Sequence, residues 1–147
     1  MDYSKLQNGS DIRGVALEGI EGQHVNLTEA ACRDIGRGFA LWLMAKTGKG
    51  EGLRVSVGRD SRLSGEALSG WICEAMAQQG LNVTDFGLAS TPAMFMSTVT
   101  EGYAFDGAVM ITASHLPFNR NGFKFFTCDG GLEKGDIKQI LQFAQGD

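Results

Sequence analysis

The chain of 147 residues is 43% hydrophobic and 20% charged, and its 13 basic residues against 17 acidic ones give a formal net charge of −4. This composition predicts one soluble globular domain, residues 1–147, with a core of its own, and the absence of a long basic run argues against nucleic acid as a partner. Three widely spaced cysteines without a C-x-x-C pair argue against a zinc site or disulfide framework, and with no apolar run of ~18 residues or signal segment we expect a cytoplasmic protein with no membrane partner.

The N-terminal part begins with a loop, residues 5–19, that leads into a short strand. Residues 27–46 then place apolar side chains at steps of four, which is typical of an amphipathic helix. Asn26 and Thr28 are both candidates for its N-cap, and Gly48 lies just beyond its end.

The rest of the chain alternates between strand and helix. β-Branched or apolar runs bounded by glycine indicate the strands, and helical spacing of apolar residues indicates the helices. The expected strands are 53–58, 81–87, 106–112 and 122–127, and the expected helices are 64–80, a helix with Thr91 before Pro92 at its first position, and 133–145.

Strands separated by helical crossovers predict a three-layer α/β/α fold with a mainly parallel sheet. Residues 122–127 follow the preceding strand too closely for a helical crossover, so we expect them to pair antiparallel at an edge of the sheet. In open α/β sheets ligands bind at the carboxyl ends of the strands. Residues 58–64, 87–91 and 112–121 are therefore the loops in which to look for chemistry.

The first of these loops contains Arg59, Asp60, Arg62 and Ser64 around a tight turn that opens a helix. Exposed N–H groups and guanidinium groups both suit phosphate oxygens, so the loop is a candidate anion site. The alternative is that Asp60 pairs with the arginines to fix the turn while Ser64 caps the helix. Residues alone leave both open.

The last loop concentrates polar groups between two apolar strands: Ser114, His115, Asn119, Arg120 and Asn121 lie within it, and Lys124 follows between two phenylalanines. Such a set suits acyl transfer with histidine as the base, or phosphoryl transfer with cations offsetting phosphate charge. Adjacent residues in an extended segment point to opposite faces, which argues against a Ser–His couple. A G-x-S-x-G elbow is also missing, so a hydrolase triad is disfavoured.

Three stretches in order resemble the α-D-phosphohexomutase family, the phosphoglucomutases and phosphomannomutases. "GSDIRG" (9–14) resembles the family's N-terminal arginine motif, "VGRDSRLSG" (57–65) its G-R-D-x-R-x-S-G loop, and "TASHLPFNRNGFKF" (112–125) its phosphoserine loop. The "STPA" at 90–93 resembles a further segment. Together they cover nearly the whole chain and point to the N-terminal domain of that family.

This resemblance implies that Ser114 carries the transferable phosphoryl group, with His115, Lys124 and Arg13 beside it. The enzyme would phosphorylate one end of a hexose monophosphate, turn the bisphosphate over and recover the other phosphate, with a glucose 1,6-bisphosphate-type activator. The remaining positions that the motifs suggest for substrate or phosphate binding are Ser10, Arg59, Asp60, Arg62, Asn121 and Arg120.

The resemblance also implies Mg²⁺, held by a phosphoryl oxygen on Ser114 and by ligands in a second domain. The magnesium, sugar-selecting and phosphate-grasping motifs of domains 2–4 are not in these 147 residues, so we expect the chain alone to be inactive and sugar preference to lie elsewhere. Leu116 stands where the family has Asn, and Ser10 where one branch has an aromatic. A catalytically silent phosphosugar-binding or regulatory module on the same scaffold is the alternative.

Overall fold

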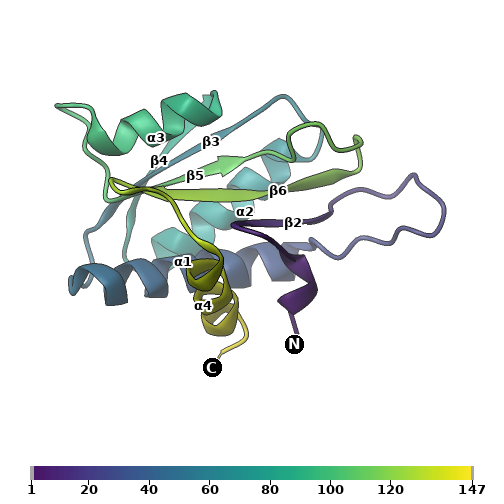
Figure 1. Cartoon of the computed structure of the whole chain (residues 1–147), viewed down its shortest axis with the longest axis horizontal. Coiled ribbons are helices and arrows are strands. Elements are labelled where there is room, and N and C mark those ends of the chain that lie inside the picture. The colour runs from purple at the N-terminus through teal and green to yellow at the C-terminus, as the bar shows by residue number, and fades with distance from the viewer. Residues whose placement is uncertain (1, 147) are drawn as a thin grey trace.

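The computed structural model describes residues 2–146, in which helices pack on both sides of a twisted sheet (Figure 1). The elements in chain order are η1 (Ser4–Leu6), β1 (Gln7–Asn8), β2 (Asp11–Val15), α1 (Glu29–Thr47), β3 (Arg54–Arg59), α2 (Gly65–Gln78), β4 (Asn82–Leu88), α3 (Thr91–Val99), β5 (Gly107–Ile111), β6 (Arg120–Thr127), β7 (Gly130–Gly131) and α4 (Lys134–Ala144). The predicted alternation of strand and helix is confirmed, and the short β1 and β7 are additional.

The strand order is β1-β2-β6-β5-β3-β4, with β7 paired to β6. β3 is parallel to β4 and β5, whereas β6 is antiparallel to both β5 and β2. Hence β2, β5, β3 and β4 all run in one direction, and the mainly parallel sheet is confirmed.

The antiparallel pairing of the strand at 122–127 is also confirmed, but its position at the edge of the sheet is wrong. β6 lies inside the sheet because β2 pairs along it, with Ile12 opposite Phe123 and Arg13 opposite Gly122. The segment at 11–15 is short and polar at two of its positions, so its pattern did not identify it as a neighbour of β6. As a result the N-terminal motif lies next to the strand that contains Lys124.

The helices form two unequal layers. α1, α2 and α4 cover one face of the sheet, and α3 covers the other (Figure 1). On the larger side the rings of Phe39 and Phe125 pack with centroids 4.6 Å apart. On the smaller side Met94 contacts Met110 and Phe126. Burial of such side chains stabilises the fold by about 1.5–3 kcal/mol each. The α/β/α layering is confirmed.

Local hydrogen bonds settle how two helices begin. Thr28 is the N-cap of α1, since its Oγ1 accepts the N–H of Ala31 at 3.1 Å. Asn26 instead accepts the N–H of Val15 at 2.7 Å and ties the helix to β2. α3 begins at Thr91 with Ser90 as its N-cap, so Pro92 takes the second helical position and not the first.

The carboxyl ends of the parallel strands lie at one edge of the sheet, together with the start of β6. The loops 60–64, 89–90 and 112–119 therefore gather there, next to the end of β2. Within residues 2–146 the longest helices lack an apolar stretch sufficient to cross a membrane.

Candidate functional site

Ser114 lies in the loop between β5 and β6, with its side chain exposed while the preceding Ala113 is fully buried. Its backbone is left-handed, with a φ of 53°. Few residues other than glycine adopt this conformation, which costs about 1–3 kcal/mol and occurs often at functional sites. The loop thus presents the hydroxyl of Ser114 to solvent on a constrained backbone.

The loop between β3 and α2 holds this conformation in place. The hydroxyl of Thr112 accepts the N–H of Ser114 at 3.1 Å and donates to Oδ2 of Asp60 at 2.6 Å. The guanidinium of Arg62 donates to the carbonyl oxygens of Ser114 and Leu116, both at 2.8 Å. Two of the three loops identified from the sequence, 58–64 and 112–121, are therefore joined by hydrogen bonds into one unit.

Asn119 anchors the far end of the same loop. Its backbone carbonyl oxygen accepts the N–H groups of Ala16 and Leu17 at 2.7 and 3.0 Å, and its buried side-chain N–H₂ donates to Oε1 of Gln23 at 2.9 Å. The segment after β2 is thereby joined to the loop of Ser114. Sequence reasoning did not assign this role to Asn119.

Arg13 is the charged side chain in contact with the hydroxyl of Ser114. Its Nη2 lies 3.4 Å from Oγ of Ser114 and 3.2 Å from Oδ2 of Asp11. The side chain crosses Gly122 on the neighbouring strand, where a Cβ would meet Cγ of Arg13 at 2.7 Å. The same Cβ would meet the backbone carbonyl oxygen of Ile12 still more closely, so glycine at 122 permits both the β2–β6 pairing and the path of the Arg13 side chain to Ser114.

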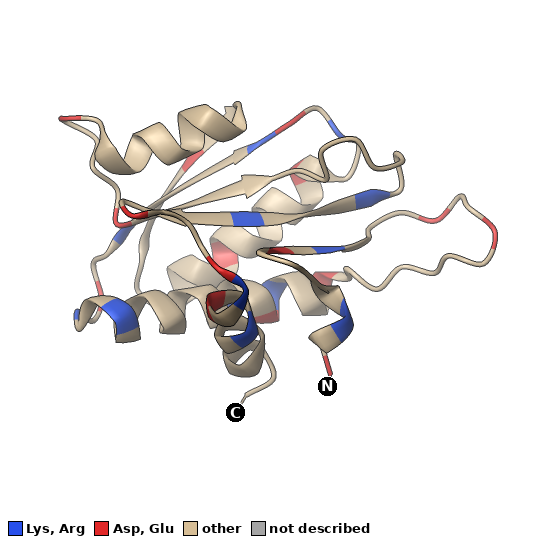
Figure 2. Cartoon of the chain, in the orientation of Figure 1, with Lys and Arg blue, Asp and Glu red and all other residues tan. Residues whose placement is uncertain are grey.

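Lys124 joins this group through Asp11. Its Nζ lies 3.1 Å from Oδ1 of Asp11, whose side chain is only 12% exposed. The contacts form a chain from Lys124 through Asp11 and Arg13 to Ser114, along β6 and β2, where Figure 2 shows basic segments on both strands. Asp11 was missed in the sequence, although its two-residue spacing from Arg13 places both on one face of a strand.

Three residues predicted to bind substrate or phosphate have their polar groups engaged within the protein. Asp60 accepts from Thr112 and from the N–H of Arg62, and Arg62 donates to the Ser114 loop. Asn121 is fully buried, and its amide donates to Oγ of Ser64 at 2.8 Å. Of the two interpretations of residues 58–65, these contacts favour the turn-fixing one for Asp60 and Arg62. Ser64 occupies the N-cap position before α2, but its side chain makes no capping hydrogen bond there.

The other predicted residues are less closely joined to Ser114. His115 is exposed, and no hydrogen bond links it to Ser114 within the part of the chain described. Arg120 begins β6 beside Val15, and Arg59 ends β3 with its side chain near Gly65 on the α2 side. Ser10 lies in the turn between β1 and β2, at the end of β2 remote from Val15.

A metal ion would find only part of its ligands in these residues. Among residues 2–146 no cluster of three or more His, Cys, Asp or Glu side chains is arranged to bind one. Asp11 contacts Arg13 and Lys124, and Asp60 accepts from Thr112, so both carboxylates already have partners. Mg²⁺ requires about six oxygen ligands, so the oxygen on Ser114 would supply one and the others must come from elsewhere.

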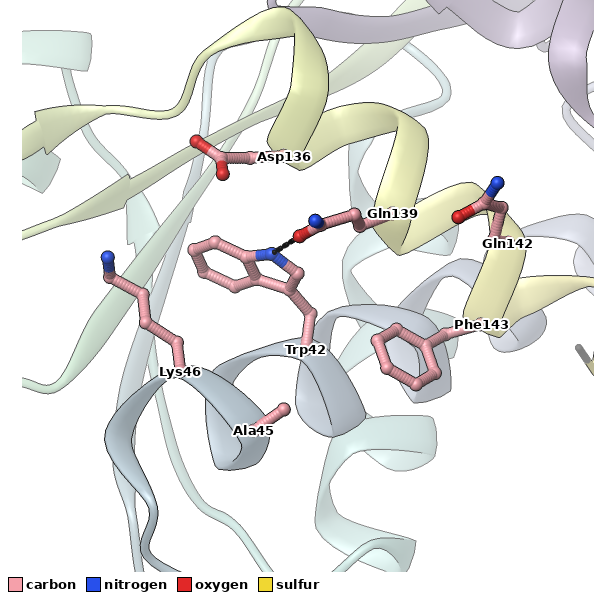
Figure 3. A pocket seen from close by; sticks show the side chains of 7 residues that line it. All are labelled: Trp42, Ala45, Lys46, Asp136, Gln139, Gln142 and Phe143. Carbon is pink, nitrogen blue, oxygen red and sulfur yellow. Dashed lines mark hydrogen bonds between the residues drawn. The ribbon is translucent and has the colours of Figure 1, made fainter.

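A hollow between two of the helices lies away from Ser114. It has a volume of about 540 Å³ between α1 and α4, and Figure 3 shows Trp42 hydrogen-bonded to Gln139 at its centre, 3.0 Å apart. None of the residues that line it belongs to the loops around Ser114. Geometry and chemistry therefore favour the Ser114 loop as the functional site over this hollow.

Comparison with known proteins agrees with the arrangement of the loops. Residues 4–146 match the model of the phosphoglucomutase/phosphomannomutase α/β/α domain I. The chain belongs to this family. Its resemblance to the N-terminal domain of the α-D-phosphohexomutases is thus confirmed, and the fold agrees with the three layers in the family's description.

Curated relatives of this domain I include phosphoglucosamine mutases. That of Natranaerobius thermophilus is 39% identical over 142 residues, covering 96% of this chain and 29% of the relative, and that of Corynebacterium jeikeium is 35% identical over 140 residues, covering 94% and 29%. A crystal structure of a phosphoglucomutase/phosphomannomutase family protein from Burkholderia thailandensis superimposes with a TM-score of 0.80 and 27% identity, over 99% of this chain and 31% of that one. The chain spans less than a third of the length of these proteins.

Proposed function

We propose that this domain I is the phosphoserine-bearing N-terminal domain of a phosphohexomutase that interconverts hexose 1-phosphate and 6-phosphate. The observation that supports it most directly is the exposed Ser114 hydroxyl, held in a left-handed conformation with Nη2 of Arg13 at 3.4 Å. We refer to the full-length protein that would include these residues as the parent protein.

In the proposed cycle, phosphorylated Ser114 transfers its phosphoryl group to a free hydroxyl of the sugar monophosphate. The P–O bond to Ser114 breaks as the new P–O bond forms, and the serine oxygen regains a proton. The resulting bisphosphate turns over, and Ser114 takes back the other phosphoryl group. Phosphoserine has a charge of about −1.5 to −2 at neutral pH, which Arg13 is positioned to offset.

Lys124 and Asp11 have a supporting part in this proposal. In the chain of contacts, Asp11 and Arg13 lie between Lys124 and the Ser114 hydroxyl. The ammonium of Lys124 therefore acts on the phosphoryl group mainly by offsetting the negative charge of Asp11 beside Arg13. The places of Lys124 and His115 beside the phosphoryl group, which the family resemblance implies, remain predictions. His115 is exposed, so it is free to contact a substrate or another domain.

The proposal includes Mg²⁺, for which a phosphoryl oxygen on Ser114 would be one ligand. The ion would supply further positive charge beside the phosphoryl group. The remaining ligands, the sugar-selecting residues and the phosphate-grasping residues are proposed to come from domains 2–4, so we expect the isolated domain I to complete no reaction cycle. A bisphosphate activator and a cytoplasmic location complete the proposal.

Glucosamine phosphate is the first substrate to test among the hexose phosphates. The relatives that match most of this chain are named phosphoglucosamine mutases, which supports an amino sugar ahead of glucose or mannose. The contacts that would distinguish these sugars are expected outside domain I.

The test is phosphorylation of the parent protein. We expect intact-mass measurement after incubation with glucose 1,6-bisphosphate to show one added phosphoryl group, and Ser114→Ala to remove both that group and mutase activity. Ser61→Ala, which changes an exposed serine of the β3–α2 loop, is the matched control and should retain both. Full mutase activity in Ser114→Ala would contradict the proposal.

The same experiment separates the alternatives. A catalytically silent binding module would bind the phosphosugar without phosphorylation of Ser114 or turnover. A serine hydrolase would be labelled at Ser114 by a fluorophosphonate probe, which we do not expect because the hydroxyl contacts Arg13 and not a histidine.

A further inference from the structure

The guanidinium of Arg62 is enclosed by the loop that presents Ser114. Nη1 donates to the carbonyl oxygens of Pro117 and Arg120 at 2.8 and 3.0 Å, and Nη2 donates to those of Ser114 and Leu116, both at 2.8 Å. The side chain is 12% exposed. An arginine has five N–H donors, so four hydrogen bonds leave only the Nε–H, which lies near Asp60 at 3.7 Å.

This bonding supplies partners to carbonyl groups of a loop that lies outside the helices and strands. Three of the four carbonyls, those of Ser114, Leu116 and Pro117, belong to the loop over residues 112–119, and the fourth belongs to Arg120 at the start of β6. One planar guanidinium that donates to all four fixes their relative orientation. The first of the four belongs to Ser114, whose left-handed backbone is the strained part of the loop.

Arg62 is itself held rigidly. Its N–H donates to Oδ1 of Asp60 at 3.2 Å, and its carbonyl accepts the N–H of Gly65 at 3.0 Å at the start of α2. Asp60 also accepts from Thr112, the residue that begins the Ser114 loop. The guanidinium therefore fixes the peptide group of Ser114 relative to the β3–α2 turn.

We propose that Arg62 is a positioning residue that holds the Ser114 backbone in its left-handed conformation, and that it does not bind the phosphate of the substrate. This inference rests on the proposed function and replaces the phosphate-binding role that the sequence motif suggested for Arg62. Its donors face the interior of the loop, whereas Arg13 approaches the Ser114 hydroxyl itself.

The test compares Arg62→Lys, Arg62→Ala and the matched control Arg37→Ala in the parent protein. Arg37 also donates to two carbonyl groups, those of Phe143 and Ala144, but at the end of α4. A loosened reacting group costs on the order of 100-fold in rate. We expect both Arg62 variants to lose about that much in kcat with KM changed less than about threefold, and Arg37→Ala to retain kcat.

Two further measurements separate positioning from phosphate binding. A lysine keeps the positive charge but lacks the planar set of N–H donors of a guanidinium. Arg62→Lys should therefore be tolerated if residue 62 binds phosphate, and should impair the enzyme if residue 62 positions the loop. Added guanidinium ion, far below denaturing concentrations, should restore at least about tenfold of the rate of Arg62→Ala. Near-normal kcat in Arg62→Lys, or a raised KM with unchanged kcat, would overturn the inference.

Amide hydrogen exchange in the Ser114 loop measures the positioning role of Arg62 independently of mutase activity. The N–H of Leu116 bonds to the carbonyl of Ala113, and that of Arg120 to Pro117, within the loop. In the Arg62 variants we expect both amides to exchange at least about tenfold faster, with those of α1 unchanged. Unchanged exchange of both would refute the positioning role, whereas an unphosphorylated Ser114 in the unmutated parent would refute the function alone.

Discussion

The ammonium of Lys124 lies 3.1 Å from the carboxylate of Asp11, although the two residues are 113 positions apart in the chain. The register that pairs Ile12 with Phe123 brings them alongside each other on β2 and β6. The other oxygen of Asp11 lies 3.2 Å from Arg13. One carboxylate thus holds both cations of the candidate site on one face of the sheet.

Replacing Asp11 by Asn should destabilise the chain and impair the site. Asparagine keeps one oxygen, so its N–H₂ would face one of the two cations, and both cations would lose the negative charge of their partner in a largely buried position. We expect urea unfolding to show a loss of about 1–3 kcal/mol, less than for a fully buried pair because Lys124 is partly exposed. In the parent protein, mutase activity should fall by about 10–100-fold.

Glu29→Gln is the matched control, because it removes a carboxylate from an exposed ion pair. Glu29 accepts from Arg33 one helical turn away in α1, where its side chain is 55% exposed. Such pairs contribute about 0.3–0.5 kcal/mol. A loss for Asp11→Asn no larger than that of the control would contradict a special role for Asp11.

Gly122→Ala should displace Arg13 from Ser114. The added Cβ would clash first with the backbone carbonyl oxygen of Ile12 and would lie 2.7 Å from Cγ of Arg13, so the β2–β6 pairing must move together with the Arg13 side chain. Overpacking of this kind costs about 1–3 kcal/mol, measurable by thermal or urea unfolding. Phosphorylation of Ser114 in the parent protein should slow as well.

Gly70→Ala, the same substitution at another position, should stabilise the chain instead of destabilising it. Gly70 is an exposed position inside α2, and a Cβ there meets nothing within 4 Å. Alanine should stabilise the chain by about 0.5–1 kcal/mol through helix propensity. A gain at 122, or a loss at 70, would show that the contacts at these glycines do not control the effect.

Stability should fall in alkaline solution. Burial raises the pKa of Cys73 from its ordinary 9.0 to about 11, and burial raises the pKa of Cys32 in the same direction. The folded state thus favours the protonated thiols. Their contribution is fully present below about pH 9 and is lost as the pH rises through the folded-state pKa.

Urea unfolding across about pH 8–11 measures this loss. Cys32→Ala should reduce the slope of the free energy of unfolding against pH, and Cys128→Ala, which removes an exposed thiol, should leave it unchanged. Some slope should persist in Cys32→Ala, because burial and a hydrogen bond to Asp34 raise the pKa of Tyr3. Equal slopes in the two cysteine variants would exclude Cys32 as a cause.

Leu116→Asn should be nearly neutral for stability. The family has an amide at this position, but here the N–H of Leu116 donates to Ala113 and its carbonyl accepts from Arg62, so the loop is bonded without it. We expect the free energy of unfolding to change by less than about 0.5 kcal/mol. A clear gain in stability would indicate that the loop lacks a hydrogen bond that the amide supplies.

Much of the fold followed from local patterns. Apolar spacing along residues 27–46 predicted α1 because helix periodicity depends on the segment itself, and the apolar run before Ser114 predicted β5 for the same reason. The strand at 122–127 was assigned to the edge because local pattern does not record which other segment pairs with it.

The sequence by itself determined the alternation of elements, the gathering of its polar loops at one edge of the sheet, and the place of Ser114 in a loop after a buried strand, since these depend on periodicity and chain direction. Only the tertiary structure decided that Asp11 lies between Arg13 and Lys124 and that Arg62 turns into the Ser114 loop. The contact of Arg62 with Ser114 joins residues 52 positions apart, and that of Lys124 with Asp11 joins residues 113 positions apart. They depend on strand register and side-chain direction, which packing of the whole chain fixes.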